Sequence, residues 1–206
     1  MKTLVCIDRD GTLIYDTKEH LFLGSQDDWK EKVTLLPSVR EGLRTLQSLD
    51  DCHVYMITNQ SGIAVKELPK LTEERAHEVC KYVVGFINQD ECLLEDYFLC
   101  AHALPEYFEN HPQYTPINDF VFSCDCIKPR LGMVTSALEE EGFNLEETKI
   151  FVIGDRVSDA MTGINAGGEG ILIPFENQPE EEVTGDIHIV RNFSEACSLI
   201  SALVKK

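Results

Sequence analysis

The chain has 206 residues, of which 43% are hydrophobic, and it carries a formal net charge of −18 at pH 7. This composition predicts one globular domain over residues 1–206, expected to be cytoplasmic and without a membrane partner because the sequence has neither a secretory leader nor an apolar run of roughly 20 residues. The acidic charge opposes binding to nucleic acid, so phosphate is expected to bind only locally, in a pocket that holds cations.

Short apolar runs alternate with helical stripes along the chain. Strands are predicted at residues 3–7, 52–57, 97–100, 149–153 and 170–174. Helices are predicted after Pro37, from Thr72, near Pro129, after Asp155 and over residues 193–204, with residues 101–127 irregular. The alternation predicts an α/β fold in which a mainly parallel sheet is covered by helices on both faces.

The stretch "CIDRDGTLI" at residues 6–14 ends an apolar run at two carboxylates, Asp8 and Asp10, followed at once by glycine. Two other predicted strands also end in polar residues, Thr58 and Asp155. Because the carboxyl ends of parallel strands meet at one edge of a sheet, these residues are expected to line one site. Converging carboxylates repel one another, and a divalent cation with oxygen ligands, Mg²⁺, removes that conflict. For Asp8 alone, a helix cap or a turn is the structural alternative.

Four motifs follow one another along the chain: "DRDGT" at 8–12, "TNQ" at 58–60, "KP" at 128–129 and "GDRVSD" at 154–159. Each of them follows a predicted strand or precedes a predicted helix. In this order the set resembles the haloacid dehalogenase superfamily of phosphohydrolases, over residues 3 to 175. The resemblance implies a Rossmann-like three-layer α/β sandwich and a phosphatase that uses Mg²⁺.

The resemblance also implies a role for each motif residue. Asp8 would be the nucleophile that accepts the phosphoryl group, and Asp10 the general acid and base. The side chains of Asp8 and Asp155 and the backbone carbonyl of Asp10 would hold Mg²⁺. Asp159 would orient a metal-bound water or cap the next helix. The phosphate- and substrate-binding residues would be Thr58, Asn59, Gln60, Ser61, Lys128 and Arg156, with a surface ion pair as the alternative role of Arg156.

A second set of possible metal ligands flanks the irregular segment. Cys100 and His102 stand at its start, and Cys124 and Cys126 stand at its end. Three thiols and one imidazole are the ligands of a closed, tetrahedral structural Zn²⁺ site, which would clip the loop at about 100–126 shut. The alternative is that these cysteines are ordinary core residues. Disulfides are not expected in a cytoplasmic protein.

The stretches "TNQSGIA" (58–64) and "KPRLGM" (128–133), together with the Cys/His loop, resemble the subgroup of heptose-bisphosphate and histidinol-phosphate phosphatases. Its members lack a large cap domain, and no segment here is long enough for one. Residues 14–36, 60–71 and 101–127 are therefore expected to select the substrate. Ile127 stands where the heptose type usually has an arginine, and Lys66 would have to replace a second arginine. The change at Ile127 weakens the assignment of a bisphosphate substrate.

The sequence thus predicts a Mg²⁺-dependent phosphomonoester hydrolase for a small phosphorylated metabolite. A heptose bisphosphate or similar sugar phosphate is the first candidate, and histidinol phosphate is the alternative. A catalytically silent protein that binds a phosphorylated ligand or a partner protein is the alternative of another class, against which the intact motif residues argue. A polynucleotide 3′-phosphatase shares the four motifs, but the acidic charge opposes that substrate. A monomer is expected.

Overall fold

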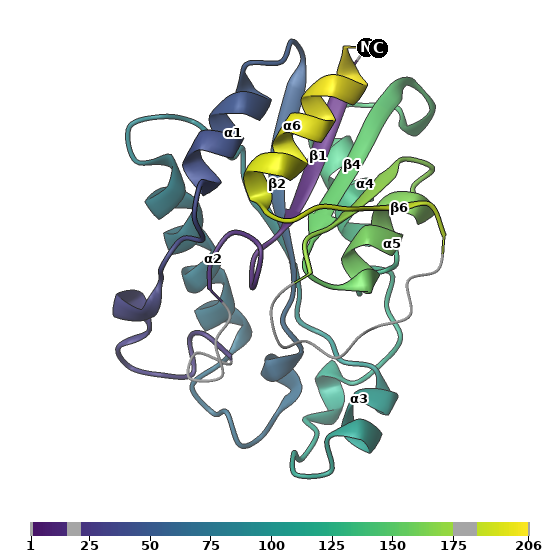
Figure 1. Ribbon diagram of the computed structural model, residues 1–206. Coiled ribbons are helices and arrows are strands. Elements are labelled where there is room, and N and C mark those ends of the chain that lie inside the picture. The colour runs from purple at the N-terminus through teal and green to yellow at the C-terminus, as the bar shows by residue number, and fades with distance from the viewer. Residues whose placement is uncertain (1, 16–21, 175–184, 206) are drawn as a thin grey trace.

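The computed structural model describes residues 2–15, 22–174 and 185–205 (Figure 1). Within this part of the chain, six strands form one parallel sheet in the order β3-β2-β1-β4-β5-β6. The fold class predicted from the sequence is confirmed, and every strand pair is parallel. The strands are β1 (Lys2–Asp8), β2 (Cys52–Asn59), β3 (Tyr97–Cys100), β4 (Thr148–Gly154), β5 (Glu169–Leu172) and β6 (Ile187–Ile189).

Helices cover both faces of the sheet and make three layers. One face packs against α1 (Val39–Gln47), α2 (Glu73–Asn88) and α6 (Phe193–Val204), and α1 and α6 lie side by side. The other face packs against α4 (Gly132–Glu140) and α5 (Val157–Asn165). The short helix α3 (Pro105–Asn110) lies at the opposite end of the molecule from both chain termini (Figure 1).

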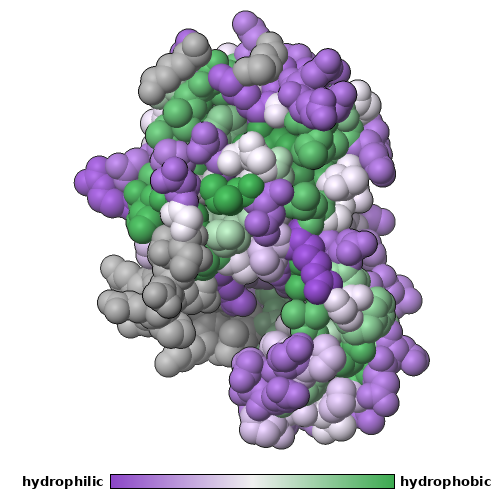
Figure 2. Space-filling model, turned by 90° about the vertical axis from the view of Figure 1, so that its right-hand side faces the viewer, coloured by the Kyte–Doolittle hydropathy of each residue, from purple (hydrophilic) through white to green (hydrophobic). Residues whose placement is uncertain are grey.

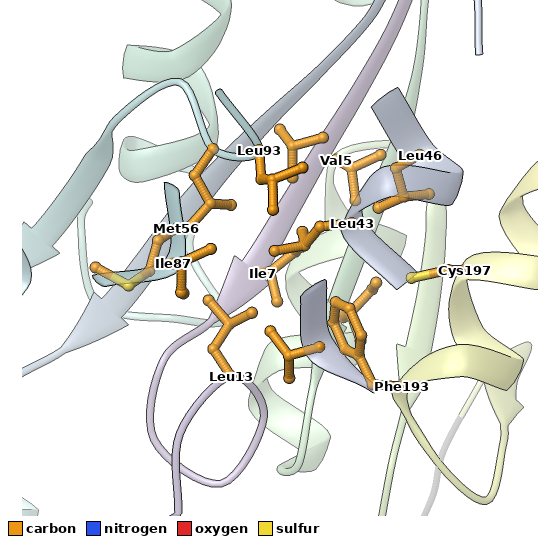
Figure 3. Close-up of a cluster of buried hydrophobic side chains, with 14 of the residues drawn as sticks. Val5, Ile7, Leu13, Leu43, Leu46, Met56, Ile87, Leu93, Phe193 and Cys197 are labelled. Atoms are coloured by element: carbon orange, nitrogen blue, oxygen red, sulfur yellow. The ribbon is translucent and has the colours of Figure 1, made fainter. Parts of the chain in front are cut away.

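The central strand β1 has no solvent-facing side. Val5 and Ile7 point into the cluster under α1 and α6, which Figure 3 shows, whereas Leu4 and Cys6 point into the cluster under α4. A strand that is buried on both faces has a continuous apolar sequence, and this is why β1 could be predicted from the sequence. Each fully buried aliphatic side chain of this kind contributes about 1.5–3 kcal/mol to folding.

Three local predictions differ from the structure. The helix expected near Pro129 begins at Gly132, because two backbone bonds, Arg130 N–H to Ile127 O (2.8 Å) and Gly132 N–H to Asp125 O (2.8 Å), close turns ahead of it. The segment 101–127, expected to be irregular, contains α3, which starts at a proline, and a short 3₁₀ helix at Asn118–Phe120. The fifth strand is Glu169–Leu172 rather than 170–174, and β6 was not predicted because three residues are too short for a periodic signal.

Three more 3₁₀ helices lie in the connections, at Trp29–Lys32, Ser61–Ala64 and Leu145–Glu147. Of these, Ser61–Ala64 directly follows β2 and begins the loop beside the strand ends. None of the helices in the described ranges combines the length and the apolar character that crossing a membrane requires.

Candidate active site

The polar ends of three strands meet at the carboxyl edge of the sheet. Asp8 is the last residue of β1, Thr58 lies near the end of β2, and Asp155 follows the last residue of β4. Because β1 pairs with β2 on one side and with β4 on the other, the three residues become neighbours in space. The order of β2, β1 and β4 also makes this edge a topological switch point, where α/β sheets bind their ligands.

A cluster of buried carboxylates occupies this edge. Oxygen atoms of Asp8, Asp155 and Asp159 all lie within 4.8 Å of one another. Lys128 inserts its ammonium group among them: Nζ contacts Oδ1 of Asp8 and lies 2.6 Å from Oδ1 of Asp159. The side chains of Lys128 and Asp159 are each only 2% exposed. Among the described residues, three carboxylates thus lie close together around one ammonium group, in a site shielded from water.

The environment shifts the pKa values of the central pair. Burial raises the pKa of Asp8 well above its usual range, the negative charges of Asp159 and Asp155 raise it further, and Lys128 opposes them. Burial by itself would lower the pKa of Lys128, but the charges of Asp159 and Asp8 outweigh burial and raise it. These shifts favour the protonated form of Lys128, and a further positive charge near Asp8 would favour its carboxylate form. This donor set of buried carboxylate oxygens fits a divalent cation such as Mg²⁺.

Each carboxylate oxygen of Asp159 has its own partner. Its Oδ2 accepts a hydrogen bond of 3.0 Å from the backbone N–H of Arg156, which caps the start of α5, while Oδ1 faces Lys128. The helix-capping role expected from the sequence is thus present together with an ion pair that was not expected. Asp159 ties α5 to the lysine and to the carboxylate cluster.

Gly11 lets the first motif approach Asp155. Its φ of +79° lies in the left-handed region, and a Cβ atom built on it would lie 2.3 Å from Oδ2 of Asp155. The Asp155 carboxylate therefore rests directly against the backbone turn that follows Asp10.

Replacing Gly11 with alanine should weaken Mg²⁺ binding about 10- to 100-fold, because the new methyl group must push the Asp155 carboxylate out of place. Gly142→Ala is the matched control, since Gly142 also has a positive φ (+60°) but nothing lies within 4 Å of its added Cβ. Calorimetric titration with Mg²⁺ measures the effect. Equal losses of affinity in the two variants would mean that backbone strain, and not contact with Asp155, is responsible.

The side chain of Asp10 turns toward Arg9 and Gln60. Arg9 donates from Nε to Oδ1 (3.0 Å) and from Nη2 to Oδ2 (2.7 Å), and Gln60 donates from Nε2 to Oδ2 (3.0 Å). Burial would raise the pKa of Asp10, but the Arg9 charge and these hydrogen bonds outweigh it and lower the pKa. Gln60 also donates to Thr58 Oγ1 (2.8 Å). The four side chains form one network beside the carboxylate cluster.

Arg9 was not among the residues selected from the sequence. Its side chain is only 1% exposed, and its Nη1 donates to Sγ of Cys80 in α2 (3.5 Å). The strand pattern gave a weak signal: Val5 and Ile7 face a helix-covered core, and position 9 continues their alternation one residue beyond the end of β1. A buried arginine at such a position requires a carboxylate partner, and Asp10 is adjacent.

The remaining predicted binding residues surround a cavity of about 440 Å³. Asn59 accepts a hydrogen bond at Oδ1 from the backbone N–H of Lys128 (3.1 Å), so it also positions that lysine. Figure 2 shows a hollow above the end of the molecule at which Figure 1 places α3. The described residues that line the cavity are Asp10, Phe22, Asn59, Gln60, Ser61, Gly62, Tyr107, His111, Gln113, Tyr114 and Arg156.

Several lining residues come from the segments that were expected to select the substrate, although no motif marked them. Phe22 belongs to residues 14–36, and Tyr107, His111 and Tyr114 belong to residues 101–127. Their proximity to Asp10 depends on how two long connections fold back over the sheet edge. His111 in particular had no assignment, because one histidine in a loop carries no sequence signal.

The four possible zinc ligands, which flank the segment 101–127 in the sequence, come together in space. The thiols of Cys100, Cys124 and Cys126 and Nδ1 of His102 lie 2.6 to 3.6 Å apart in pairs. A tetrahedral ion with bonds of about 2.3 Å separates its sulfur ligands by about 3.8 Å, so the donor set is compact enough for one ion. All four cysteine and histidine side chains are donors of the kind that Zn²⁺ selects.

This fold is the one that the resemblance to the haloacid dehalogenase superfamily implies, and the motif carboxylates and the motif lysine lie together at one edge of its sheet. The family described as "Polynucleotide kinase 3 phosphatase" matches residues 3–169, and the chain belongs to this family. Curated relatives include the histidine biosynthesis bifunctional protein HisB of Campylobacter jejuni (strain 81-176), 30% identical over 168 residues that cover 82% of this chain and 40% of that protein. HisB of Bacteroides fragilis is 30% identical over 176 residues, 84% of this chain and 39% of that protein. The chain thus spans about 40% of the length of these relatives.

Solved structures agree with this fold. The D,D-heptose 1,7-bisphosphate phosphatase of B. bronchiseptica, complexed with magnesium and phosphate, matches with a TM-score of 0.72 at 18% identity, over 99% of each chain. The D,D-heptose 1,7-bisphosphate phosphatase of Burkholderia thailandensis matches with a TM-score of 0.55 at 14% identity, over 100% of each chain. At these identities the similarity establishes the shared fold.

Proposed function

We propose that the protein is a Mg²⁺-dependent phosphomonoester hydrolase that acts on a small phosphorylated metabolite through an aspartyl-phosphate intermediate. The observation that carries this proposal is the buried cluster of Asp8, Asp155 and Asp159 around Lys128 at the carboxyl edge of the sheet. Buried carboxylates that lie this close together repel one another, and a divalent cation bound between them would relieve that repulsion.

The carboxylate cluster suits Mg²⁺ in its donor atoms and in its charge. Asp8 and Asp155 would hold the ion through their side chains, Asp10 through its backbone carbonyl, and Asp159 lies close enough to contact it or a water on it. When bound, Mg²⁺ would supply positive charge that favours the carboxylate form of Asp8 and would orient the phosphoryl group by binding one of its oxygens. This requirement matches the raised pKa of Asp8 in the protein alone.

Asp8 and Asp10 would divide the hydrolysis into two steps. An oxygen of Asp8 attacks phosphorus, the ester P–O bond breaks, and the leaving oxygen takes a proton from Asp10. Asp10 has to carry this proton in the substrate complex, although Arg9 and Gln60 lower its pKa in the protein alone. Asp10 then takes a proton from water, the water oxygen attacks phosphorus, and the bond to Asp8 breaks to release inorganic phosphate. Lys128 and Thr58 stabilise the phosphoryl oxygens, and Arg9 and Gln60 hold Asp10 in place.

The comparisons support two kinds of substrate. Similarity to heptose-bisphosphate phosphatases supports a sugar phosphate, and similarity to HisB supports histidinol phosphate. A nucleic acid is disfavoured by the net charge of −18, despite the family's name. We propose a monomer that acts in the cytoplasm on a free metabolite, with no nucleic-acid or membrane partner.

Release of inorganic phosphate from a panel of sugar phosphates, histidinol phosphate and nucleotides, with and without Mg²⁺, tests this function. Turnover that depends on Mg²⁺, ranked by kcat/KM, is the expected result. A wild-type chain that binds these esters but releases no phosphate with Mg²⁺, Mn²⁺ or Co²⁺ would instead support the catalytically silent alternative.

The cluster of Cys100, His102, Cys124 and Cys126 is proposed to hold a structural Zn²⁺. Two hydrogen bonds connect this cluster with the active site. The backbone N–H of Gln60 donates to the carbonyl of Cys100 (2.8 Å), and the backbone N–H of Lys128, two residues after Cys126, donates to Oδ1 of Asn59 (3.1 Å). Ordering of the loop therefore also orders the lysine and the glutamine of the site.

Replacing Cys124 with serine should release the zinc, from about one ion per chain to almost none, and should increase proteolysis within residues 101–127. Elemental analysis of the purified chain and limited trypsin digestion measure both effects. Cys92→Ser is the control, because Cys92 is an exposed free thiol outside the cluster. Well-folded wild type that contains no zinc, even after growth in zinc, would contradict the proposal.

A further inference from the structure

The cavity next to the active site opens at Asp10, whereas Asp8 and Lys128 do not line it. Asp10 is the group proposed to protonate the leaving oxygen, so the cavity lies on the side of the leaving group rather than of the phosphate. Its volume of about 440 Å³ suits a molecule with a single ring. What lines this cavity therefore bears on which alcohol the enzyme releases.

One wall of the cavity consists of four rings, which we call the aromatic wall: Phe22, Tyr107, His111 and Tyr114. The rings of Tyr107 and His111 are stacked, with centroids 4.4 Å apart and planes inclined by 25°. Tyr114 continues the stack at 6.2 Å from His111, and Phe22 meets Tyr114 edge-on at 5.9 Å. A wall of this kind offers apolar surface and ring edges to a ligand.

Two hydrogen bonds help to fix the aromatic wall in place. Nδ1 of His111 donates to the carbonyl of Tyr107 (2.7 Å). The segment after Tyr114 is joined to the loop after β2 by the bond from Lys66 N–H to Thr115 O (3.0 Å). The wall is thus pre-organised, which reduces the entropy lost when a ligand binds.

Phe22 reaches this wall at a cost in backbone conformation. Its φ of 57° lies in the left-handed region, which a bulky residue rarely adopts. Its ring also occupies the space beside Gly62, where an added Cβ would lie 2.3 Å from Cδ1 of Phe22. Strain of this kind gathers at functional sites, where the surrounding structure maintains it.

The described residues around the cavity offer few positive charges to a second phosphate. Arg156 is the one cation among the described residues that line it, and Asp10 contributes a negative charge. Ile127, at the position where the heptose type usually has an arginine, is buried in the core under α4 and does not line the cavity. A leaving group with another phosphate would find one cation, whereas an uncharged ring would find four aromatic partners.

We propose that the aromatic wall determines specificity by binding an uncharged ring, sugar or aromatic, in the leaving group of a substrate that carries a single phosphate. This inference rests on the proposed function for the direction of the substrate in the site. According to this proposal, Phe22, Tyr107, His111 and Tyr114 determine specificity. The protein should then not prefer a bisphosphate, the kind of substrate for which the heptose-bisphosphate phosphatases of similar fold are named.

The test measures binding and turnover of four esters: glycerol 3-phosphate, glucose 1-phosphate, glucose 1,6-bisphosphate and 2-phenylethyl phosphate. Affinity is measured in an Asp8→Asn chain, and kcat/KM in wild type, so that binding is tested even if turnover fails. At least one of the two ring monophosphates should be favoured at least tenfold over glycerol 3-phosphate. The second phosphate of the bisphosphate should add less than threefold. The relative affinities of glucose 1-phosphate and 2-phenylethyl phosphate distinguish a sugar from an aromatic ring.

Tyr114→Leu and His111→Leu should each reduce the preference for the ring ester about 3- to 10-fold. Gly62→Ala should do the same without altering any ring, because it displaces Phe22. Phe108→Leu, which removes a ring of α3 that does not line the cavity, should leave the preference unchanged. Thermal unfolding checks that each variant folds.

The outcomes separate this proposal from the proposed function. Turnover without any ring preference, or a bisphosphate favoured tenfold over the monophosphate, would overturn the aromatic wall and leave the phosphatase intact. Equal losses for ring and acyclic esters in the wall variants would also overturn it. Ring preference in binding, without turnover of any ester, would support the wall and contradict the phosphatase.

Discussion

Replacing Asp8 with asparagine should reduce phosphate release by about 10⁴-fold or more, while the chain still folds. Asparagine has the same shape but no negative charge, so the attack on phosphorus is lost. The variant should not lose stability without Mg²⁺, because Asp8 is one of three buried carboxylates around a single ammonium. Removing one of them relieves repulsion that raises the pKa of Asp8 in the native state.

Two measurements test this result: phosphate release with a preferred ester, and thermal unfolding in EDTA and in excess Mg²⁺. Wild type should gain stability when Mg²⁺ is added, and the Asp8→Asn variant should gain less, because one ligand is weakened. Asp119→Asn, a change at an exposed aspartate, is the control and should alter neither measurement. Turnover within tenfold of wild type would remove the nucleophilic role from Asp8.

The positions of Asp8, Thr58 and Asp155 could be predicted from the sequence for a physical reason. Each lies at the carboxyl end of a strand or directly after it. Burial on both faces gives such a strand a continuous apolar run, and parallel strands bring their carboxyl ends to one edge. The Cys/His cluster could be predicted because metal ligands of one kind occur in two tight pairs. In both cases the pattern that allows the prediction, an apolar run with a polar end or a pair of metal ligands two residues apart, is contained in a short stretch of sequence.

The cavity and its aromatic wall could not be predicted in the same way. Phe22 and Tyr114 are far apart in the chain and meet only because two irregular connections cover the sheet edge. Neither connection has a periodic pattern, so the sequence does not indicate which side chains point inward. The start of α4 was misplaced for a related reason: Pro129 is favourable in a first helical turn, but hydrogen bonds from Arg130 and Gly132 hold the preceding residues in turns.

Replacing Lys128 with methionine should destabilise the chain by about 3–5 kcal/mol without Mg²⁺, a fall of about 6–20 °C in Tm, and should also abolish turnover. Methionine fills the space of the lysine stem but leaves Asp8 and Asp159 buried without their cation. The matched control is Lys70→Met. Lys70 contacts Asp27 at the same 2.6 Å as Lys128 contacts Asp159, but both partners are largely exposed, so the control should cost at most about 1 kcal/mol.

A second change separates uncompensated charge from lost packing. Lys128→Met combined with Asp159→Asn removes a buried negative charge but keeps a side-chain oxygen that can cap α5 at the backbone N–H of Arg156. The double variant should therefore be more stable than Lys128→Met alone, and Mg²⁺ should stabilise the single variant more than wild type, since it supplies the missing positive charge. Denaturant unfolding with and without Mg²⁺ measures these differences. If Lys128→Met and Lys70→Met lost the same small amount of stability, the buried carboxylates would not be charged in the native state, and the electrostatic need for a divalent ion at this site would disappear.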